Sequence, residues 1–350
     1  MNKLDTDYQN LLKDILKNGV QKSDRTGTGT ISVFGRSIRH KMSDGFPLLT
    51  TKKMHTRGIA TELLWFLRGD TDIRFLWDND CNIWNGDWLK EYRKNNPDDH
   101  SISYIKNKIR YDDYYSEKSI WSLGPIYGSQ WRAWNKDSDS GANKRVDQIL
   151  ELIHNLKVNP DSRRLLVTAW NPSDLSKQTL PPCHYGFQCY TRELSLIERR
   201  DASIDRGFRF NVDDTNKTAE EDYYNKNNIP RRALTLKWMQ RSCDFPLGIP
   251  YNIASYGFLL EILSKKVNMI PDELIGDFGD CHIYTNQIDG VKEQLERTSY
   301  NLPKIKLNDD LDWFNEDLDS VISWMSSNIS DWFDIINYKS HPAIKIPLSN

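Results

Sequence analysis

The stretch Leu180–Tyr190, LPPCHYGFQCY, places a cysteine and a histidine directly after two prolines. Proline fixes φ at about −65° and disfavours helix in the residue before it, so Pro181 and Pro182 hold the chain extended ahead of Cys183. A polar His184 is costly in a plain core, whereas a nucleophilic cysteine acts as a thiolate and needs positive charge nearby. A buried structural thiol is the ordinary alternative, and this stretch alone leaves both interpretations open.

The composition sets limits around this motif. The 350 residues are 38% hydrophobic and 27% charged, which is typical of a globular protein. The formal net charge is −2, so the overall charge of the protein does not attract nucleic acid. The five cysteines show no Cys-x-x-Cys spacing, so we expect free thiols and no metal site. The amino terminus has no secretory core, and no apolar run approaches the roughly 18 residues of a membrane helix. We expect a cytoplasmic protein, or one of the host cytoplasm if the source is viral.

Periodicity predicts alternating helices and strands. Helices are expected over 3–17, 60–70, 145–157 and 252–267, strands over 163–170, 184–191 and 233–242, and a short strand followed by a helix from Gly279. Two polar stretches, at about 89–120 and 198–232, interrupt this pattern. We interpret them as surface insertions in a single catalytic domain over 1–350. They are either solvated elaborations or a contact surface, within a dimer or for another enzyme.

Arginines lie at the edges of several apolar segments. Arg25, Arg163, Arg164 and Arg241 are either solvated or, together with Ser242 and the turn DRTGTGT at 24–30, suited to bind a phosphate monoester. The planar guanidinium fork matches phosphate oxygens, which favours arginine for this task.

Other polar residues interrupt apolar runs. Glu62 stands within ATELLWFL, where a carboxyl must be paired, protonated or functional, and a structural salt bridge is the plain alternative. Asn252 and His282 border apolar runs, and an amide that donates and accepts at once suits the edge of a nucleobase.

Taken together, these segments resemble the thymidylate synthase family over most of the chain. The matching segments, in order, are DRTGTGT (24–30), FPLLTTKK (46–53), ELLWFLRGDT (62–71), IW (83–84), LGPIYGSQWRAW (123–134), DSRR…AWNP (161–172), LPPCH (180–184), QRSCD (240–244), LGIPYNIASY (247–256), GDCHIY (279–284) and HPAIK (341–345). The resemblance implies an α+β fold with three-layer α/β character. A large mixed β-sheet would be packed with helices, and one sheet face would form a homodimer interface.

The resemblance also implies roles for particular residues. For catalysis it implies Cys183, Glu62, Arg241, Asn252, Tyr127, His184 and Asp244. For dUMP it implies Arg25, Arg163, Arg164, Arg241, Ser242, Asp244, Asn252, His282 and Tyr284. For the folate it implies Ile83, Trp84, Asp244, Gly248, Tyr251 and Ser349. Arg163 and Arg164 would reach the phosphate bound by the neighbouring subunit, so a homodimer follows.

The activity implied is reductive methylation of dUMP to dTMP with 5,10-methylenetetrahydrofolate, through a bond between Cys183 and C6 of the pyrimidine. Asn252 indicates uracil, because the related dCMP hydroxymethylases carry Asp at that position. The main alternative is a dUMP hydroxymethylase, in which water completes the reaction in place of hydride. Asn85 and the polar ending IPLSN depart from the family pattern and leave this choice open. An inactive relative kept for binding is a further alternative, and specific nucleic-acid binding is not expected.

Overall fold

The computed structural model describes residues 2–24, 26–95, 101–109, 118–134, 145–210 and 217–349. Its centre is a six-stranded sheet in the order β1-β2-β6-β5-β4-β3. The strands are β1 (Val20–Lys22), β2 (Thr30–Lys41), β3 (Leu166–Thr168), β4 (His184–Glu193), β5 (Arg232–Asp244) and β6 (Ile270–Tyr284), and β7 (Lys304–Leu307) pairs with β8 (Phe333–Ile336) in a small separate sheet. Only the β5–β6 pair of the large sheet is parallel, so the expectation of a large mixed sheet is confirmed.

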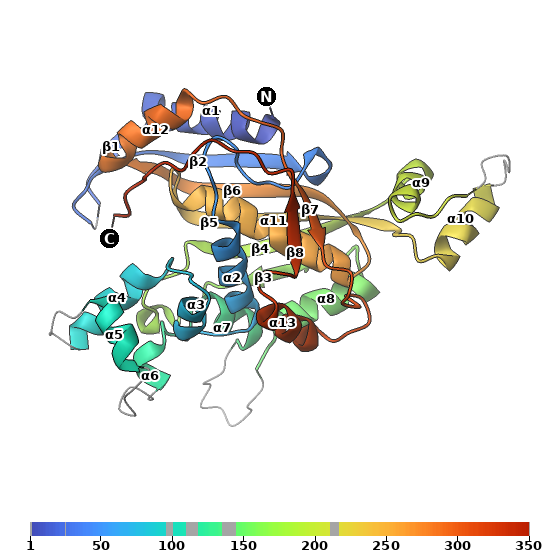
Figure 1. The fold of residues 1–350 in the computed structure, drawn as a ribbon, viewed down its shortest axis with the longest axis horizontal. Helices are drawn as coiled ribbons and strands as arrows, with labels where there is room; N and C mark the ends of the chain where they lie inside the picture. Colours follow the sequence, from blue (N-terminus) through green and yellow to red (C-terminus); the bar gives the residue numbers. More distant parts are fainter. Residues whose placement is uncertain are drawn as a thin grey trace.

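Helices cover one face of the large sheet, where Tyr8 of α1 (Lys3–Asn18) and Tyr256 of α11 (Gly248–Lys266) join a continuous aromatic cluster with the strand residues Trp238 and Phe278 (Figure 1). The other face is open, and Tyr190 on it is exposed. Above the sheet in that view lie α1 and α12 (Ile288–Leu295). Below these two helices in that view lie α2 (Thr56–Leu67), α3 (Arg74–Asp78), α7 (Tyr127–Arg132), α8 (Gln148–Val158), α11 and α13 (Leu318–Ser327), with α4 (Asn85–Asn95), α5 (Ile102–Ile109) and α6 (Lys118–Trp121) beyond them. The helical layers and the sheet share one hydrophobic core.

The parallel pairing of β5 and β6 positions the site. Parallel neighbours need a crossover connection, which α11 provides. The carboxyl ends of both strands therefore meet at one edge of the sheet, where Asp244 is the register partner of His282. β4 runs antiparallel to β5, so it begins at this same edge, directly after Cys183. We call this edge the site end and the opposite one the far end.

Two expected strands have different lengths in the structure. The strand expected over 163–170 covers only Leu166–Thr168, because Arg163 and Arg164 belong to an exposed loop in which the Ser162 hydroxyl accepts from the Arg164 N–H. The expected short strand near Gly279 is instead the 15-residue β6. Its first half includes Asp272, Glu273 and Asp277, whose side chains are at least partly exposed and mask the strand pattern.

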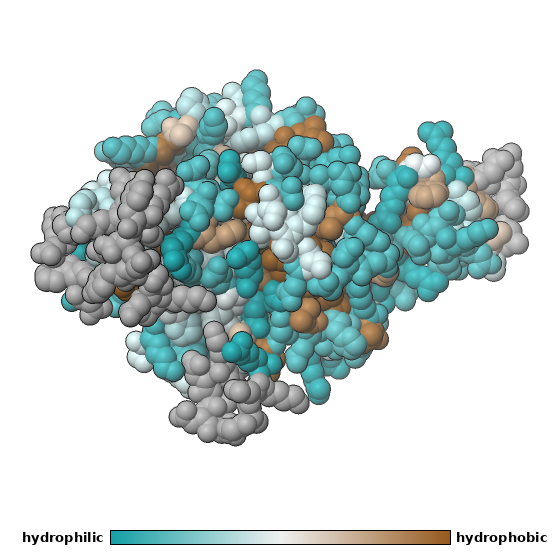
Figure 2. Space-filling model, turned by 60° about the horizontal axis from the view of Figure 1, so that its bottom comes forward, coloured by the Kyte–Doolittle hydropathy of each residue, from teal (hydrophilic) through white to brown (hydrophobic). Residues whose placement is uncertain are grey.

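The described parts of the second polar stretch, residues 196–210 and 217–229, form a projecting arm between β4 and β5. It contains α9 (Leu196–Asp205) and α10 (Lys217–Lys226) and extends away from the body at the right of Figures 1 and 2. A small cluster of its own, Ala202, Tyr224 and Ile229, holds the arm together. In the first polar stretch, the described parts fold as α5, α6 and most of α4.

Polar colours dominate the face shown in Figure 2, with apolar patches scattered over it. Within the described ranges, no helix combines the length and apolar character needed to cross a bilayer.

Candidate active site

Cys183 lies at the site end, in the loop that leads into β4. It is half-buried, whereas the other four cysteines are buried, and all five are free thiols. Its backbone N–H donates to the Tyr127 hydroxyl at 2.7 Å, and the Ser242 hydroxyl hydrogen-bonds to its sulfur. Burial raises the pKa of the Cys183 thiol, while the charge of Arg241 opposes that rise. The one half-buried thiol of the chain is therefore also the one served by a cation.

Arg241 holds the loop that presents this thiol. Its backbone N–H donates to the Cys183 carbonyl at 2.8 Å, and its guanidinium donates to the carbonyls of Pro182 and Pro181, both at 2.9 Å. The same guanidinium lies over the Trp170 ring, 5.4 Å from its centroid. Arg241 remains exposed, and a guanidinium has five N–H donors, so donors remain for an anion beside the thiol.

Glu62 projects from α2 toward Trp84, whose indole N–H donates to its carboxylate at 2.7 Å. Burial raises the pKa of Glu62 to about 7. No salt bridge to Glu62 occurs among the described residues, so the plain alternative of a structural ion pair does not apply there. A carboxyl with a pKa near neutrality is suited to take up and release a proton.

Tyr127 and His184 form an aromatic wall next to Glu62 and Cys183. Their rings stack with centroids 4.2 Å apart, and the Tyr256 hydroxyl lies 2.9 Å from Nδ1 of His184. Burial lowers the pKa of His184 to about 3, so this imidazole is neutral at physiological pH.

Asp244, at the end of β5, faces a second part of the site. Its carboxylate accepts from the Leu247 N–H at 3.1 Å and from the side-chain amide of Gln287 at 3.2 and 3.3 Å. Burial raises the pKa of Asp244. The buried ammonium of Lys52 donates to the Pro246 carbonyl, and burial lowers its pKa to about 8.

Asn252, in the first turns of α11, borders Asp244 through Gly248. A Cβ added at Gly248 would lie 3.8 Å from both Oδ1 of Asn252 and Cβ of Asp244. Within the described part of the chain, the Asn252 amide makes no side-chain hydrogen bond, so its donor and acceptor are available to a ligand. Tyr251, its neighbour, is half-buried.

His282 and Tyr284 complete the end of β6. His282 is buried, and its Nδ1 lies 3.1 Å from an Asp280 carboxylate oxygen. The two rings meet edge to face with centroids 5.2 Å apart.

The outer residues of the expected folate surface differ in exposure. Trp84 is 6% exposed and Ile83 is 38% exposed. Ser349 exchanges hydrogen bonds with the Asn286 amide, which ties the carboxyl-terminal segment to the end of β6. Asn85 accepts from the Trp77 indole N–H at 2.6 Å, so this departure from the family pattern has a structural role at the start of α4.

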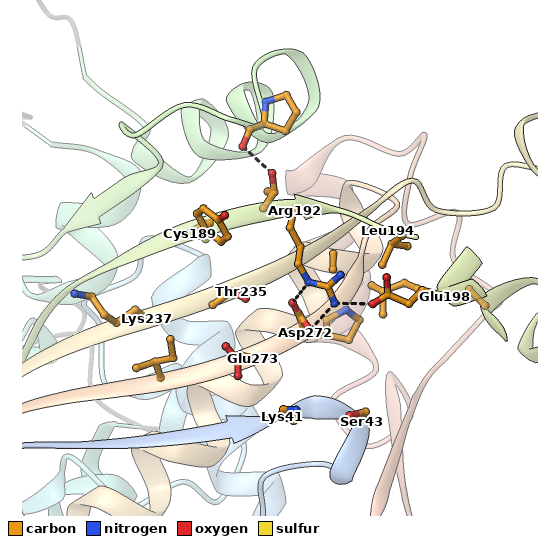
Figure 3. Close-up of a pocket in the computed structure, with 18 of the residues that line it drawn as sticks. Lys41, Ser43, Cys189, Arg192, Leu194, Glu198, Thr235, Lys237, Asp272 and Glu273 are labelled. Atoms are coloured by element: carbon orange, nitrogen blue, oxygen red, sulfur yellow. Dashed lines mark hydrogen bonds and ion pairs between the residues drawn. The ribbon is translucent and has the colours of Figure 1, made fainter. Parts of the chain in front are cut away.

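Two of the expected phosphate ligands, Arg163 and Arg164, are not gathered with the rest. Arg25 lies outside the described residues. Arg163 and Arg164 are exposed and lie away from the site end, beside β4. Arg163 lines a hollow of about 1090 Å³ between the sheet face and α9. Figure 3 shows this hollow, with Arg192 bridging Asp272 and Glu198. Cys183 does not line it, so the hollow is separate from the candidate active site.

Sequence reasoning missed three residues of the site. Tyr256 is four residues beyond Asn252 on α11, a spacing that places both on one helix face and was a usable signal. Lys52 stands in the quoted segment FPLLTTKK without an assigned role. Gln287 gives no signal of this position in the sequence, because its amide nitrogen donates to Asp244 and Pro347, which are 43 and 60 positions away.

Comparison with known proteins identifies the family of the chain. The family model described as thymidylate synthase matches residues 6–350. A protein of Mycoplasma mobile named thymidylate synthase is 40% identical over 344 residues, covering 97% of each chain. The chain therefore belongs to the thymidylate synthase family of enzymes.

Proposed function

We propose that this protein converts dUMP to dTMP, with 5,10-methylenetetrahydrofolate as the donor of both the methylene group and the hydride. The observation that carries the proposal is the arrangement of Cys183, Ser242 and Arg241 at the site end. It joins a half-buried thiol, a hydroxyl and an exposed cation with donors to spare. That combination suits a nucleophile placed next to a bound phosphate ester.

The chemistry proposed for Cys183 is covalent. Its thiolate adds to C6 of the uracil ring, which makes C5 nucleophilic toward the methylene carbon of the folate. Loss of the C5 proton and of the folate amine leaves an exocyclic methylene on the pyrimidine. Hydride from the reduced folate then converts this group to methyl, and the thiolate leaves as C5–C6 is restored. The products are dTMP and dihydrofolate.

Substrate selection is assigned to the residues around the thiol. The unpaired amide of Asn252 would donate to and accept from the uracil edge, and leaving such groups unmatched by a wrong base costs about 1–3 kcal/mol each. His282 and Tyr284 would hold the ribose hydroxyl. Ser242 and Arg241 would bind the phosphate, with Arg25 as a further ligand from the turn DRTGTGT.

Proton transfer and exclusion of water are assigned to the other side of the site. Glu62, with its pKa near 7, would exchange protons with the pyrimidine through water, supported by Tyr127 and His184. Asp244 would contact the pterin, and Ile83, Trp84, Gly248, Tyr251 and Ser349 would border the folate. The buried position of Trp84, hydrogen-bonded to Glu62, favours hydride over water as the final reactant.

A homodimer is proposed because Arg163 and Arg164 lie too far from their own site end to bind the phosphate there. The Arg163 carbonyl faces the Gln188 amide, and Gln188 pairs with Lys237. At about 3.3 Å per residue along a strand, Gln188 is roughly 17 Å from Cys183, and Lys237 is equally far from Ser242. A second copy stacked on the open sheet face with its direction reversed would bring these arginines to the partner site.

The test is analysis of the product by mass after incubation with dUMP and methylenetetrahydrofolate. The expected result is a gain of CH2 by the nucleotide, with one dihydrofolate formed per turnover. A gain of CH2O with tetrahydrofolate released would instead establish the hydroxymethylase. Cys183→Ala is the control and should abolish turnover while dUMP still binds. Turnover near the normal rate in that variant would contradict the covalent mechanism.

A further inference from the structure

Gln287 occupies the turn between β6 and α12, in the short helix η4 (Thr285–Gln287), and its side chain is fully buried. Its amide oxygen accepts from the Tyr284 N–H at 3.1 Å. Its amide nitrogen donates to the Asp244 carboxylate at 3.2 and 3.3 Å and to the Pro347 carbonyl at 3.0 Å. An amide NH2 has two hydrogens, so Asp244 and Pro347 take one each. A single side chain thus connects three segments.

These three segments belong to different parts of the proposed site. Tyr284 ends β6 on the ribose side, Asp244 ends β5 on the pterin side, and Pro347 belongs to the carboxyl-terminal tail, residues 344–349. The tail is seated on α12, because a Cβ at Gly290 would lie 2.6 Å from Ile346 and 3.2 Å from Ile344. The tail is therefore held by packing on α12, by the hydrogen bond from Gln287 to Pro347 and by the hydrogen bonds between Ser349 and Asn286.

We propose that Gln287 is a positioning residue that couples closure of the tail to the placement of Asp244, and so to folate binding and water exclusion. This inference rests on the proposed function. The coupling arises because a departing tail leaves one buried N–H of Gln287 without an acceptor, which is costly. The Gln287 amide can then lower its free energy by rotating toward another acceptor. In the rotated position it no longer forms the hydrogen bonds that hold Asp244 and Tyr284 in place. Tail and carboxylate move together because they share one rigid group.

The electrostatics of Asp244 agree with this role. Burial raises its pKa, and the Gln287 amide acts against that rise by donating to the ionised form. The other charged or titratable groups that interact electrostatically with this carboxylate are Lys52, His282, Tyr8 and Cys183. Without the amide donor, the carboxylate takes up a proton at a higher pH.

The test compares Gln287→Met with Gln294→Met. Gln294 is equally buried and lies in the adjacent helix, but its amide donates to Thr51, away from the tail. Loss of a hydrogen bond to a charged group predicts a rise of about tenfold or more in the KM for methylenetetrahydrofolate in Gln287→Met, with the KM for dUMP within about twofold. Tritium released from C5-labelled dUMP should exceed dTMP formed, because the less sealed site loses intermediates. Gln294→Met should leave both quantities unchanged.

A truncated variant that lacks residues 347–350 deletes the acceptor itself. In that background Gln287→Met should have little additional effect on the folate KM, because both changes break the same link. In the pH profile of kcat/KM for folate, the acid limb should move to higher pH in Gln287→Met. It should stay where it is in Gln294→Met. Additive effects of Gln287→Met and the truncation on the folate KM would overturn the proposal. Equal changes in Gln287→Met and Gln294→Met would overturn it as well. A wild-type protein that forms no dTMP would instead refute the proposed function, which is a separate result.

Discussion

At the scale of single residues, Glu62 shows how burial makes the ionised form of a carboxyl unfavourable. Its carboxyl is removed from water and receives one indole N–H, with no cation bonded to it among the described residues. The folded protein therefore prefers the protonated form up to a pKa of about 7, whereas the ordinary value is 4.5. Between these two values the folded state binds more protons than the unfolded state, so stability falls as the pH rises.

Glu62→Gln is expected to stabilise the protein while reducing its activity. At pH 8 the wild type holds an ionised, buried carboxylate at a cost of at most about 3 kcal/mol, and the amide removes this cost. The gain should shrink toward pH 5, where the carboxyl of the wild type is protonated when folded. Urea unfolding at pH 5, 6.5 and 8, at one protein concentration, measures the difference in unfolding free energy between Glu62→Gln and the wild type. The exposed Glu151→Gln serves as control, and a gain that does not vary with pH would contradict the argument.

At the scale of elements, the arm has its own source of stability. Glu220 is buried between α9 and α10, where its carboxylate accepts from the Arg200 guanidinium at 2.8 and 2.9 Å and from the Tyr224 hydroxyl at 2.6 Å. Tyr224 belongs to the cluster that holds the arm together, and this cluster is separate from the main core. The arm can therefore open without the body.

Glu220→Ala should release the arm selectively. Removing the shared carboxylate leaves the Tyr224 O–H without its acceptor and the Arg200 guanidinium without its carboxylate partner, which costs about 1–3 kcal/mol. Amide hydrogen exchange should accelerate within the arm, while amides of β5 and β6 beyond the arm keep their protection. The neighbouring exposed Glu221→Ala should leave exchange unchanged. Faster exchange throughout the sheet would mean that arm and body unfold as one unit.

Elements also show how far the sequence alone reaches. Apolar periodicity was enough for α1, α2, α8 and α11, and the quoted motifs singled out Cys183 and Glu62 as candidates, because these signals are local. β6 was underestimated, since the polar residues on its uncovered face imitate a loop. The pairing of His184 with Tyr256 joins positions 72 apart, and no local pattern encodes it. What the sequence did not provide was contact between distant segments.

At the scale of the whole molecule, the separation between the site end and Arg163 predicts that activity requires two chains. Mixed dimers test this directly. A Cys183→Ala chain and a chain carrying Arg163→Ala with Arg164→Ala should each be nearly inactive, while random mixing after unfolding and refolding should restore about a quarter of the wild-type activity. Half of the dimers are then hybrids, each with one complete site of two. A mixture no more active than its components would contradict arginines acting in the partner.

The parallel pairing of β5 with β6 also gives refolding an order in time. Parallel strands cannot close as a hairpin, so the chain that contains α11 has to cross over before the two strands can lie side by side. Long-range pairing of this kind is slow compared with the formation of helices. Asp244 arrives beside His282 only in that step. We therefore expect the proposed nucleotide site to be completed late in refolding, after most of the helices have formed.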